Sequence, residues 1–246
     1  MRRGIMKFKK LIVLATIGLF ISLFNISYAE DLGTRKLVDT TKDPKSKYAA
    51  RYDPDYSLHC SATMITDKIG LTAKHCAGNK KINGYIGAVY PGHSGLSTPF
   101  GMMNISEYIP NDANDIAIIK GEEKDMDNTY KHYMKNTNIN ITPFSTDELK
   151  KLKGKEVYSY GYPGINLTGY KQYKSEGVIT SYNPITGDIS TTLPSEPGQS
   201  GSGVFLKDGD RFLGVLHSHY NDNNGNHLGR VTPMNVRLTN WFNANK

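Results

Sequence analysis

Short apolar runs separated by glycine, asparagine, proline and aspartate recur along most of this chain of 246 residues. Runs of about four to eight residues with such boundaries predict β-strands. The first clear strand spans 60–65, and a turn at 67–70 leads into a second strand at 70–73. Further strands are predicted at 82–90, 115–120, 157–180, 188–193, 204–206, 212–217 and 229–231. The pattern therefore predicts an all-β protein.

Helical patterns are confined to two short segments. Residues 121–146 are hydrophilic and lack a clear period, so they predict a connection between two halves of the chain. Ser145 followed by Glu148 matches a capping box and predicts a short helix directly afterwards. Residues 235–242 predict a C-terminal helix with Pro233 in its first turn and an apolar face packed on the core.

The first 29 residues have the pattern of a secretory signal peptide. A basic start precedes an apolar run at 11–24, and small residues precede a cleavage site after Ala29. The run is shorter than the roughly 20 residues of a membrane-spanning helix, so we expect a secreted, extracellular protein without a membrane contact after cleavage. Residues 30–50 are polar and predict a pro-segment or a flexible lead-in, and both alternatives stay open.

The charge balance argues against a nucleic-acid-binding protein. The chain has a net charge of +7, but the leader holds five of the 30 basic residues and no acidic ones, which leaves 25 basic and 23 acidic residues. No stripe of lysine and arginine with interleaved aromatic residues is present in the sequence. We therefore expect no nucleic-acid partner.

The segment 71–76, Leu-Thr-Ala-Lys-His-Cys, is the first of three that suggest catalysis. His75 adjoins Cys76, and Cys60 is the only other cysteine. In an oxidising compartment the two cysteines can form a disulfide. Such a bond would fix the position of the imidazole, as a general base requires. The alternative is a structural disulfide beside an uninvolved histidine.

The segment 197–203 is the second. It places Ser200 in a tight glycine-rich turn, where the hydroxyl is accessible and the N–H groups of Gly198 and Ser200 can form an oxyanion hole. An ordinary glycine- and serine-rich loop is the alternative. Ser200 is the candidate nucleophile, and His75 is the candidate base that takes its proton.

The segment 114–120 is the third. Asp115 leads directly into an apolar strand, where a buried carboxylate needs a partner such as an imidazole. A turn aspartate that caps the strand is the alternative. Taken with the other two segments, Asp115 is the candidate group that orients the imidazole of His75.

These three segments resemble those of the chymotrypsin-like serine protease family. Within that family, the segments 161–164, 235–237 and 200–202 resemble those of the bacterial branch of glutamyl endopeptidases and exfoliative toxins. The resemblance implies two six-stranded antiparallel β-barrels, at 51–125 and 126–246, with the active site in the cleft between them and a C-terminal α-helix. It implies an acyl-enzyme endopeptidase that acts on polypeptides. The alternative is a narrowly selective protease or a toxin-like binding protein on the same fold. Gln199 stands where asparagine or aspartate is common in the family.

The same resemblance assigns the specificity pocket. Pro194 would lie at its base, which argues against a basic P1 residue, and Ser195 matches a wall position that helps bind a glutamate carboxylate. A one-residue slip of the following strand decides whether His217 or Leu216 faces the pocket, since strand side chains alternate. His217 favours glutamate at P1 and Leu216 an apolar residue, and we expect glutamate. His217 and His219 make an incomplete metal site, so we expect no metal and no cofactor, in a monomer.

Overall fold

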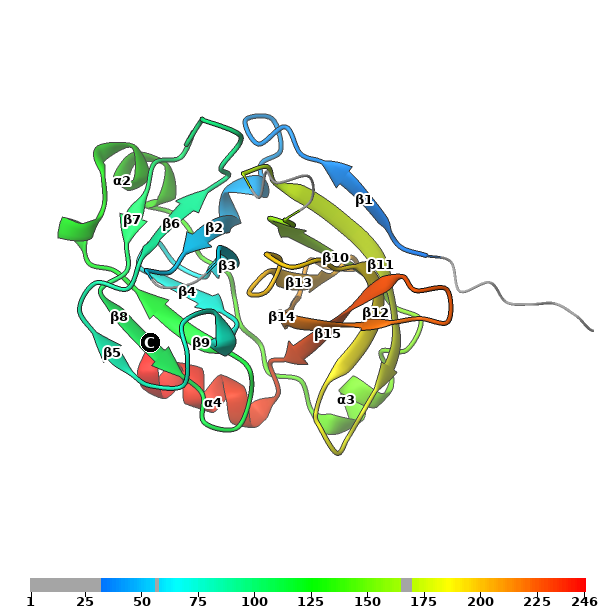
Figure 1. Ribbon diagram of the computed structural model, residues 1–246. Coiled ribbons are helices and arrows are strands. Elements are labelled where there is room, and N and C mark those ends of the chain that lie inside the picture. Colours follow the sequence, from blue (N-terminus) through cyan, green and yellow to red (C-terminus); the bar gives the residue numbers. More distant parts are fainter. Residues whose placement is uncertain (1–31, 56–57, 165–169) are drawn as a thin grey trace, which may run out of the picture. The chain divides into compact units, whose positions relative to one another are not determined.

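The computed structural model describes residues 32–55, 58–164 and 170–246 (Figure 1). The predicted signal peptide, 1–29, lies outside these residues. Within them the fold is mostly β, with two antiparallel sheets: one is formed by the strands between residues 49 and 120, and the other by the strands between residues 156 and 233 together with β1 (Thr34–Leu37). No helix in this part of the chain is long and apolar enough to cross a membrane.

The first sheet is a half-barrel. Its eight strands pair in the order β5-β8-β9-β4-β3-β2-β6-β7, and the two end strands do not pair with each other. The strands are β2 (Ala49–Asp53), β3 (Cys60–Met64), β4 (Ile69–Thr72), β5 (Ile82–Asn83), β6 (Ala88–Pro91), β7 (Met103–Asn104), β8 (Glu107–Pro110) and β9 (Ala117–Lys120). The sheet thus differs from the closed six-stranded barrel expected for this half.

The second sheet is a closed barrel of six strands, as expected. The strands run in the order β11-β10-β13-β14-β15-β12, and β12 pairs back onto β11. They are β10 (Glu156–Gly161), β11 (Tyr173–Tyr182), β12 (Ile189–Pro194), β13 (Gly203–Leu206), β14 (Phe212–Asn221) and β15 (His227–Pro233). The predicted fold class, all-β with a C-terminal helix, is confirmed.

The C-terminal helix α4 (Val236–Asn245) packs on the half-barrel (Figure 1). In the chain it follows β15, the last strand of the closed barrel. Leu238 and Phe242 share an apolar cluster with Leu71 of β4 and Phe212 of β14, so the cluster joins both halves. The helix was predicted, but the place of Pro233 in its first turn was wrong. Pro233 ends β15, where its lack of an N–H costs little.

The predicted connection contains one helix that the pattern missed. Helix α2 (Asn128–Met134) has seven residues and buries only Tyr130 and Met134. This is too short a segment for a helical period to stand out in the sequence. The predicted capping box is present, with Ser145 and Glu148 bonded reciprocally at the start of α3 (Thr146–Lys150). Short 3₁₀ turns complete the fold: η1 (Ser46–Tyr48), η2 (Lys74–Cys76) and η3 (Glu123–Asp125).

The segment predicted as a lead-in packs against the body of the protein. Strand β1 (Thr34–Leu37) pairs with the first part of β11 and lies along the outer edge of the barrel (Figure 1). Val38 and Ser46 are buried, and residues 49–50 begin β2 inside the half-barrel. Residues 34–50 therefore contribute to the fold, whether or not the chain is processed upstream.

Cys60 and Cys76 form a disulfide that ties β3 to the turn η2. The bond closes a loop with a sequence separation of 16 residues. Closing such a loop reduces the conformational freedom of the unfolded chain. The disulfide therefore stabilises the turn that carries His75.

Replacing both cysteines by alanine should lower the free energy of unfolding by about 3 kcal/mol, because the unfolded chain regains the freedom of that loop. Urea denaturation of the oxidised protein, the reduced protein and the double variant measures this effect. The reduced protein is the matched control, since it keeps both side chains. Equal midpoints for all three would contradict the prediction.

Candidate active site

The structure brings most of the predicted site residues to one cavity of about 250 Å³. The cavity opens between the turn η2 of the half-barrel and the second barrel. The residues that line it are His75, Ser195, Glu196, Pro197, Ser200, Leu216, His217, Ser218 and His219. The predicted base and the predicted nucleophile thus share one cavity, although 125 positions separate them in the numbering.

Asp115 holds His75 by two hydrogen bonds. The Nδ1 atom of His75 lies 2.8 Å from Oδ2 of Asp115, and the backbone N–H of His75 donates to Oδ1 at 3.0 Å. Because the carboxylate accepts a hydrogen bond from Nδ1–H, it favours the tautomer that leaves Nε2 of the ring free. The side chain of His75 is half exposed, so this free nitrogen is accessible.

The pKa of Asp115 reflects two opposing effects. Partial burial of the carboxylate raises its pKa, because the charged form loses hydration. The hydrogen bonds from the ring and the backbone of His75 outweigh this effect and lower the pKa below its ordinary value. Asp115 is therefore a carboxylate at neutral pH and can stabilise a positively charged imidazole.

The loop that carries Asp115 is fixed from two sides. The side-chain oxygen of Asn111 accepts hydrogen bonds from the backbone N–H groups of residues 113 and 114. The ammonium group of Lys74 donates to the backbone carbonyl of Asn111 at 2.9 Å. On the other side, Arg237 of helix α4 donates to Oδ1 of Asn114 at 2.6 Å. The C-terminal helix thus contributes to the position of the carboxylate.

Two glycines with positive φ shape the turn around Ser200. Gly198 has φ 93° and Gly201 has φ 94°. A Cβ atom on Gly201 would overlap the carbonyl oxygen of Ser61, so only glycine fits there. Among the residues that the structure describes, the N–H groups of Gly198 and Ser200 donate no hydrogen bond. Both are therefore free to bind a ligand.

A β-bulge brings both candidate pocket residues to the cavity. The pairing of β14 with β15 shifts register between Leu216 and Ser218, so His217 is an extra residue in the ladder. The sequence left open which of the two residues would face the cavity, and the structure places both there. Leu216 is 1% exposed and also belongs to the barrel core. His217 lies between two carboxylates, 3.8 Å from Asp115 and 3.3 Å from Asp188.

Two residues that line this cavity, Glu196 and His219, and their neighbour His227 were not expected there from the sequence. His219 stacks on His227 of β15 with ring centroids 4.4 Å apart, and His227 lies 3.1 Å from the carboxylate of Glu196. Ser195, which was expected, is buried in the cavity wall, and its N–H donates to the carbonyl of His227. His219 and His227 occupy diagonal positions on the paired strands β14 and β15. Their proximity could be predicted only if the register of these two strands were known.

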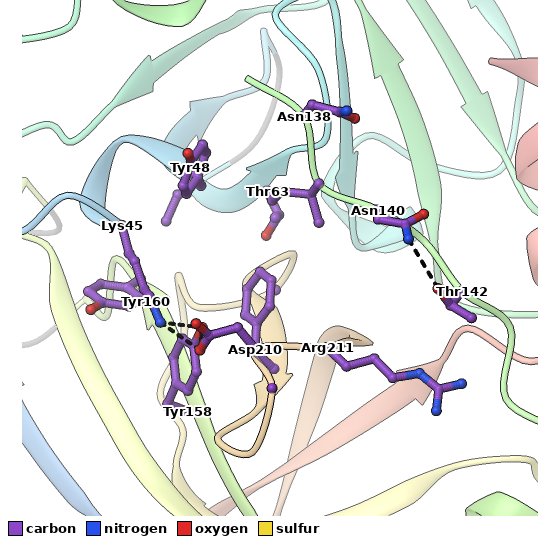
Figure 2. A pocket seen from close by; sticks show the side chains of 15 residues that line it. Lys45, Tyr48, Thr63, Asn138, Asn140, Thr142, Tyr158, Tyr160, Asp210 and Arg211 are labelled. Atoms are coloured by element: carbon purple, nitrogen blue, oxygen red, sulfur yellow. Dashed lines mark hydrogen bonds and ion pairs between the residues drawn. The ribbon is translucent and has the colours of Figure 1, made fainter. Parts of the chain in front are cut away.

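A larger cavity, of about 430 Å³, lacks the groups for nucleophilic catalysis (Figure 2). Lys45 pairs with Asp210 at 2.6 Å on its wall, and Tyr158 donates to the same carboxylate. None of the described residues that line it is a serine, a histidine or a cysteine, so it lacks the combination of a serine or cysteine nucleophile and an imidazole base. The smaller cavity is therefore the candidate active site.

The side chains of Cys60, His75 and Cys76 lie close enough together to suggest a metal site, with their ligand atoms within 4.8 Å of one another. The two sulfur atoms, however, are bonded to each other. A disulfide offers no thiolate, and the thiolate is the form that binds zinc. This cluster is therefore a disulfide beside a histidine.

Comparisons with known proteins agree with this fold. A protein-family model described as Trypsin matches residues 41–242. A structure described as a Glu endopeptidase in complex with MPD is similar over 87% of this chain and 96% of that chain, with 22% identity and a TM-score of 0.68. No curated protein sequence matches.

Two further solved structures share the fold. A thermostable serine protease from an extremophilic microorganism has 16% identity and a TM-score of 0.61, over 83% of this chain and all of its own. The protease Anisep from Arthrobacter nicotinovorans has 18% identity and a TM-score of 0.59, over 86% of this chain and 98% of its own. With the family model matching most of its length, the chain belongs to the trypsin family of serine proteases, hydrolases that act on peptide bonds.

Proposed function

We propose that this serine endopeptidase cleaves polypeptides with Ser200 as nucleophile, His75 as general base and Asp115 as the group that orients the base. The observation that carries the proposal is the His75–Asp115 hydrogen bond of 2.8 Å at a cavity that Ser200 also lines. Because Nδ1 is bonded to the carboxylate, Nε2 is the nitrogen that would take the hydroxyl proton.

The reaction follows from these positions. Oγ of Ser200 attacks the carbonyl carbon of the scissile bond while its proton passes to His75. The protonated imidazole then returns that proton to the leaving amine, the C–N bond breaks and an acyl-enzyme remains. Water, deprotonated by the same base, releases the acid and restores Ser200. The free N–H groups of Gly198 and Ser200 support their role as donors to the oxyanion.

We propose a preference for glutamate at P1. Ser195 offers a hydroxyl on the cavity wall, and the cavity also presents the imidazoles of His217 and His219. His217 already faces two carboxylates, so His219 is the imidazole more available to a substrate carboxylate. The charge of Glu196 is partly offset by Arg35, whose Nη1 lies 3.9 Å away, and its other carboxylate oxygen lies 3.1 Å from Nδ1 of His227. The similar Glu endopeptidase structure supports the same preference.

We also propose that the protein is secreted. The disulfide between Cys60 and Cys76 is the supporting observation, because such bonds persist in oxidising compartments. The predicted leader at 1–29 supplies the route.

A fluorophosphonate should label the mature protein on Ser200, and the Ser200→Ala variant should take up no label and cleave no peptide. The reagent reacts with an activated serine, so heat-denatured protein is the control for non-specific labelling. Peptide mapping by mass spectrometry identifies the modified residue. A label on a different serine, or none on folded wild-type protein, would refute the proposed mechanism.

Asp115→Asn should lower kcat by about 10⁴-fold, because an amide no longer favours the productive tautomer of His75. Asp112→Asn is the matched control, since Asp112 lies exposed on the same loop. Steady-state kinetics on one peptide substrate measure both variants. Equal kcat values for the two variants would exclude Asp115 from the mechanism.

Peptides that differ only at P1 test the proposed specificity. The substrate with glutamate should exceed the isosteric glutamine substrate in kcat/KM by about tenfold or more, as expected for a charge-assisted hydrogen bond. His219→Gln should remove that ratio, whereas His217→Gln should lower kcat for both peptides because His217 lies beside Asp115. Cleavage after leucine or phenylalanine instead would assign the pocket to the apolar side chain of Leu216.

A further inference from the structure

Strand β1 places one cationic side chain against the loop that carries Ser200. Arg35 pairs with Ser175 of β11 across the sheet, and its side chain is only 16% exposed. The guanidinium reaches Gln199, a residue 164 positions away in the sequence and directly before the proposed nucleophile. The contact therefore joins the start of the folded chain to the active-site loop.

The side-chain amide of Gln199 receives two hydrogen bonds through one oxygen. Nη2 of Arg35 donates to Oε1 of Gln199 at 3.1 Å, and the backbone N–H of Glu196 donates to the same atom at 2.9 Å. Because both partners are donors, they determine which way the amide points. Gln199 is 1% exposed, so removing a donor leaves a buried acceptor short of a partner.

The main-chain hydrogen bonds of Gln199 link the orientation of its side chain to that of the neighbouring Ser200. The N–H of Gln199 donates to the carbonyl of Glu196 at 3.1 Å, and its carbonyl accepts the N–H of Ser202 at 3.0 Å. The peptide group between Gln199 and Ser200 supplies the N–H that we assign to the oxyanion. The position of the Gln199 side chain therefore determines the direction of that donor.

Arg35 also lies close to Glu196, a residue that lines the cavity. Its Nη1 lies 3.9 Å from one carboxylate oxygen of Glu196, and the other oxygen lies 3.1 Å from Nδ1 of His227. His227 in turn stacks on His219 at the cavity. Burial lowers the pKa of Arg35, while the charge of Glu196 opposes this effect. A guanidinium stays charged under these conditions.

We propose that Arg35 is a positioning residue, which holds the loop 196–200 in its active conformation through Gln199 and Glu196. This inference rests on the proposed role of Ser200. It implies that the active enzyme retains β1, and that any processing of the predicted segment 30–50 occurs before residue 35. In this protein an internal arginine then orders the active-site loop.

Three variants separate positioning from general support of the fold. Arg35→Met removes the guanidinium and keeps an apolar stem, while Arg35→Lys keeps a single charged donor. Lys36→Met is the matched control, because Lys36 is the exposed neighbour on the same strand and loses the same charge. Arg35→Met should lower kcat on a peptide substrate by about tenfold or more with little change in KM, since one charge-assisted hydrogen bond is lost. Arg35→Lys should recover part of the loss.

Hydrogen–deuterium exchange gives a readout that does not depend on catalysis. Arg35→Met should speed exchange in peptides that cover residues 195–203 and leave those covering 60–65 unchanged. The thermal midpoint should stay close to that of Lys36→Met. N-terminal sequencing of active material should find Arg35 present.

Two results would overturn the inference while the proposed function stands. One is a fluorophosphonate reaction on Ser200 that proceeds at the same rate in Arg35→Met, Lys36→Met and wild-type protein. The other is fully active material whose N-terminus begins after residue 35. If Ser200 is not labelled in the wild-type protein at all, the proposed function fails and the inference fails with it.

Discussion

The two halves of the protein meet at Ser61, and the geometry of the proposed catalytic groups depends on that junction. Ser61 is fully buried in β3, where its N–H donates to the carbonyl of Ser200 and its hydroxyl to the carbonyl of Gly198, both at 2.8 Å. Its neighbour Cys60 is bonded to Cys76, in the turn of the proposed base. Buried hydrogen bonds cost about 1–3 kcal/mol to leave unmade, so the nucleophile loop is held firmly against the half-barrel.

The two ends of the described chain extend this constraint. Helix α4 packs on the half-barrel, and its Arg237 donates a hydrogen bond to Asn114, the residue before the proposed orienting carboxylate. Strand β1 pairs with β11 of the closed barrel, and its Arg35 donates a hydrogen bond to Gln199, the residue before the proposed nucleophile. Each end of the chain thus contributes a guanidinium that contacts a neighbour of a proposed catalytic residue. An arginine suits both places because it remains charged and donates in a fixed geometry.

Local sequence indicated the proposed triad because each member has informative neighbours. His75 adjoins a cysteine, Asp115 precedes an apolar strand and Ser200 stands among glycines. The pocket wall has no such local signal. That both Leu216 and His217 reach the cavity depends on a bulge in β14, and a bulge forms only when the partner strand fixes the register.

The sequence by itself determined the strand-rich class, the C-terminal helix and the three segments with catalytic residue types, because periodicity, turn chemistry and capping act over a few residues. Only the tertiary structure decided that the first sheet stays open and that β1 joins the second barrel. It also decided that Arg35 reaches Gln199. The contacts of β1 and of Arg35 join residues more than 100 positions apart, so they follow from how the two sheets pack rather than from any local pattern.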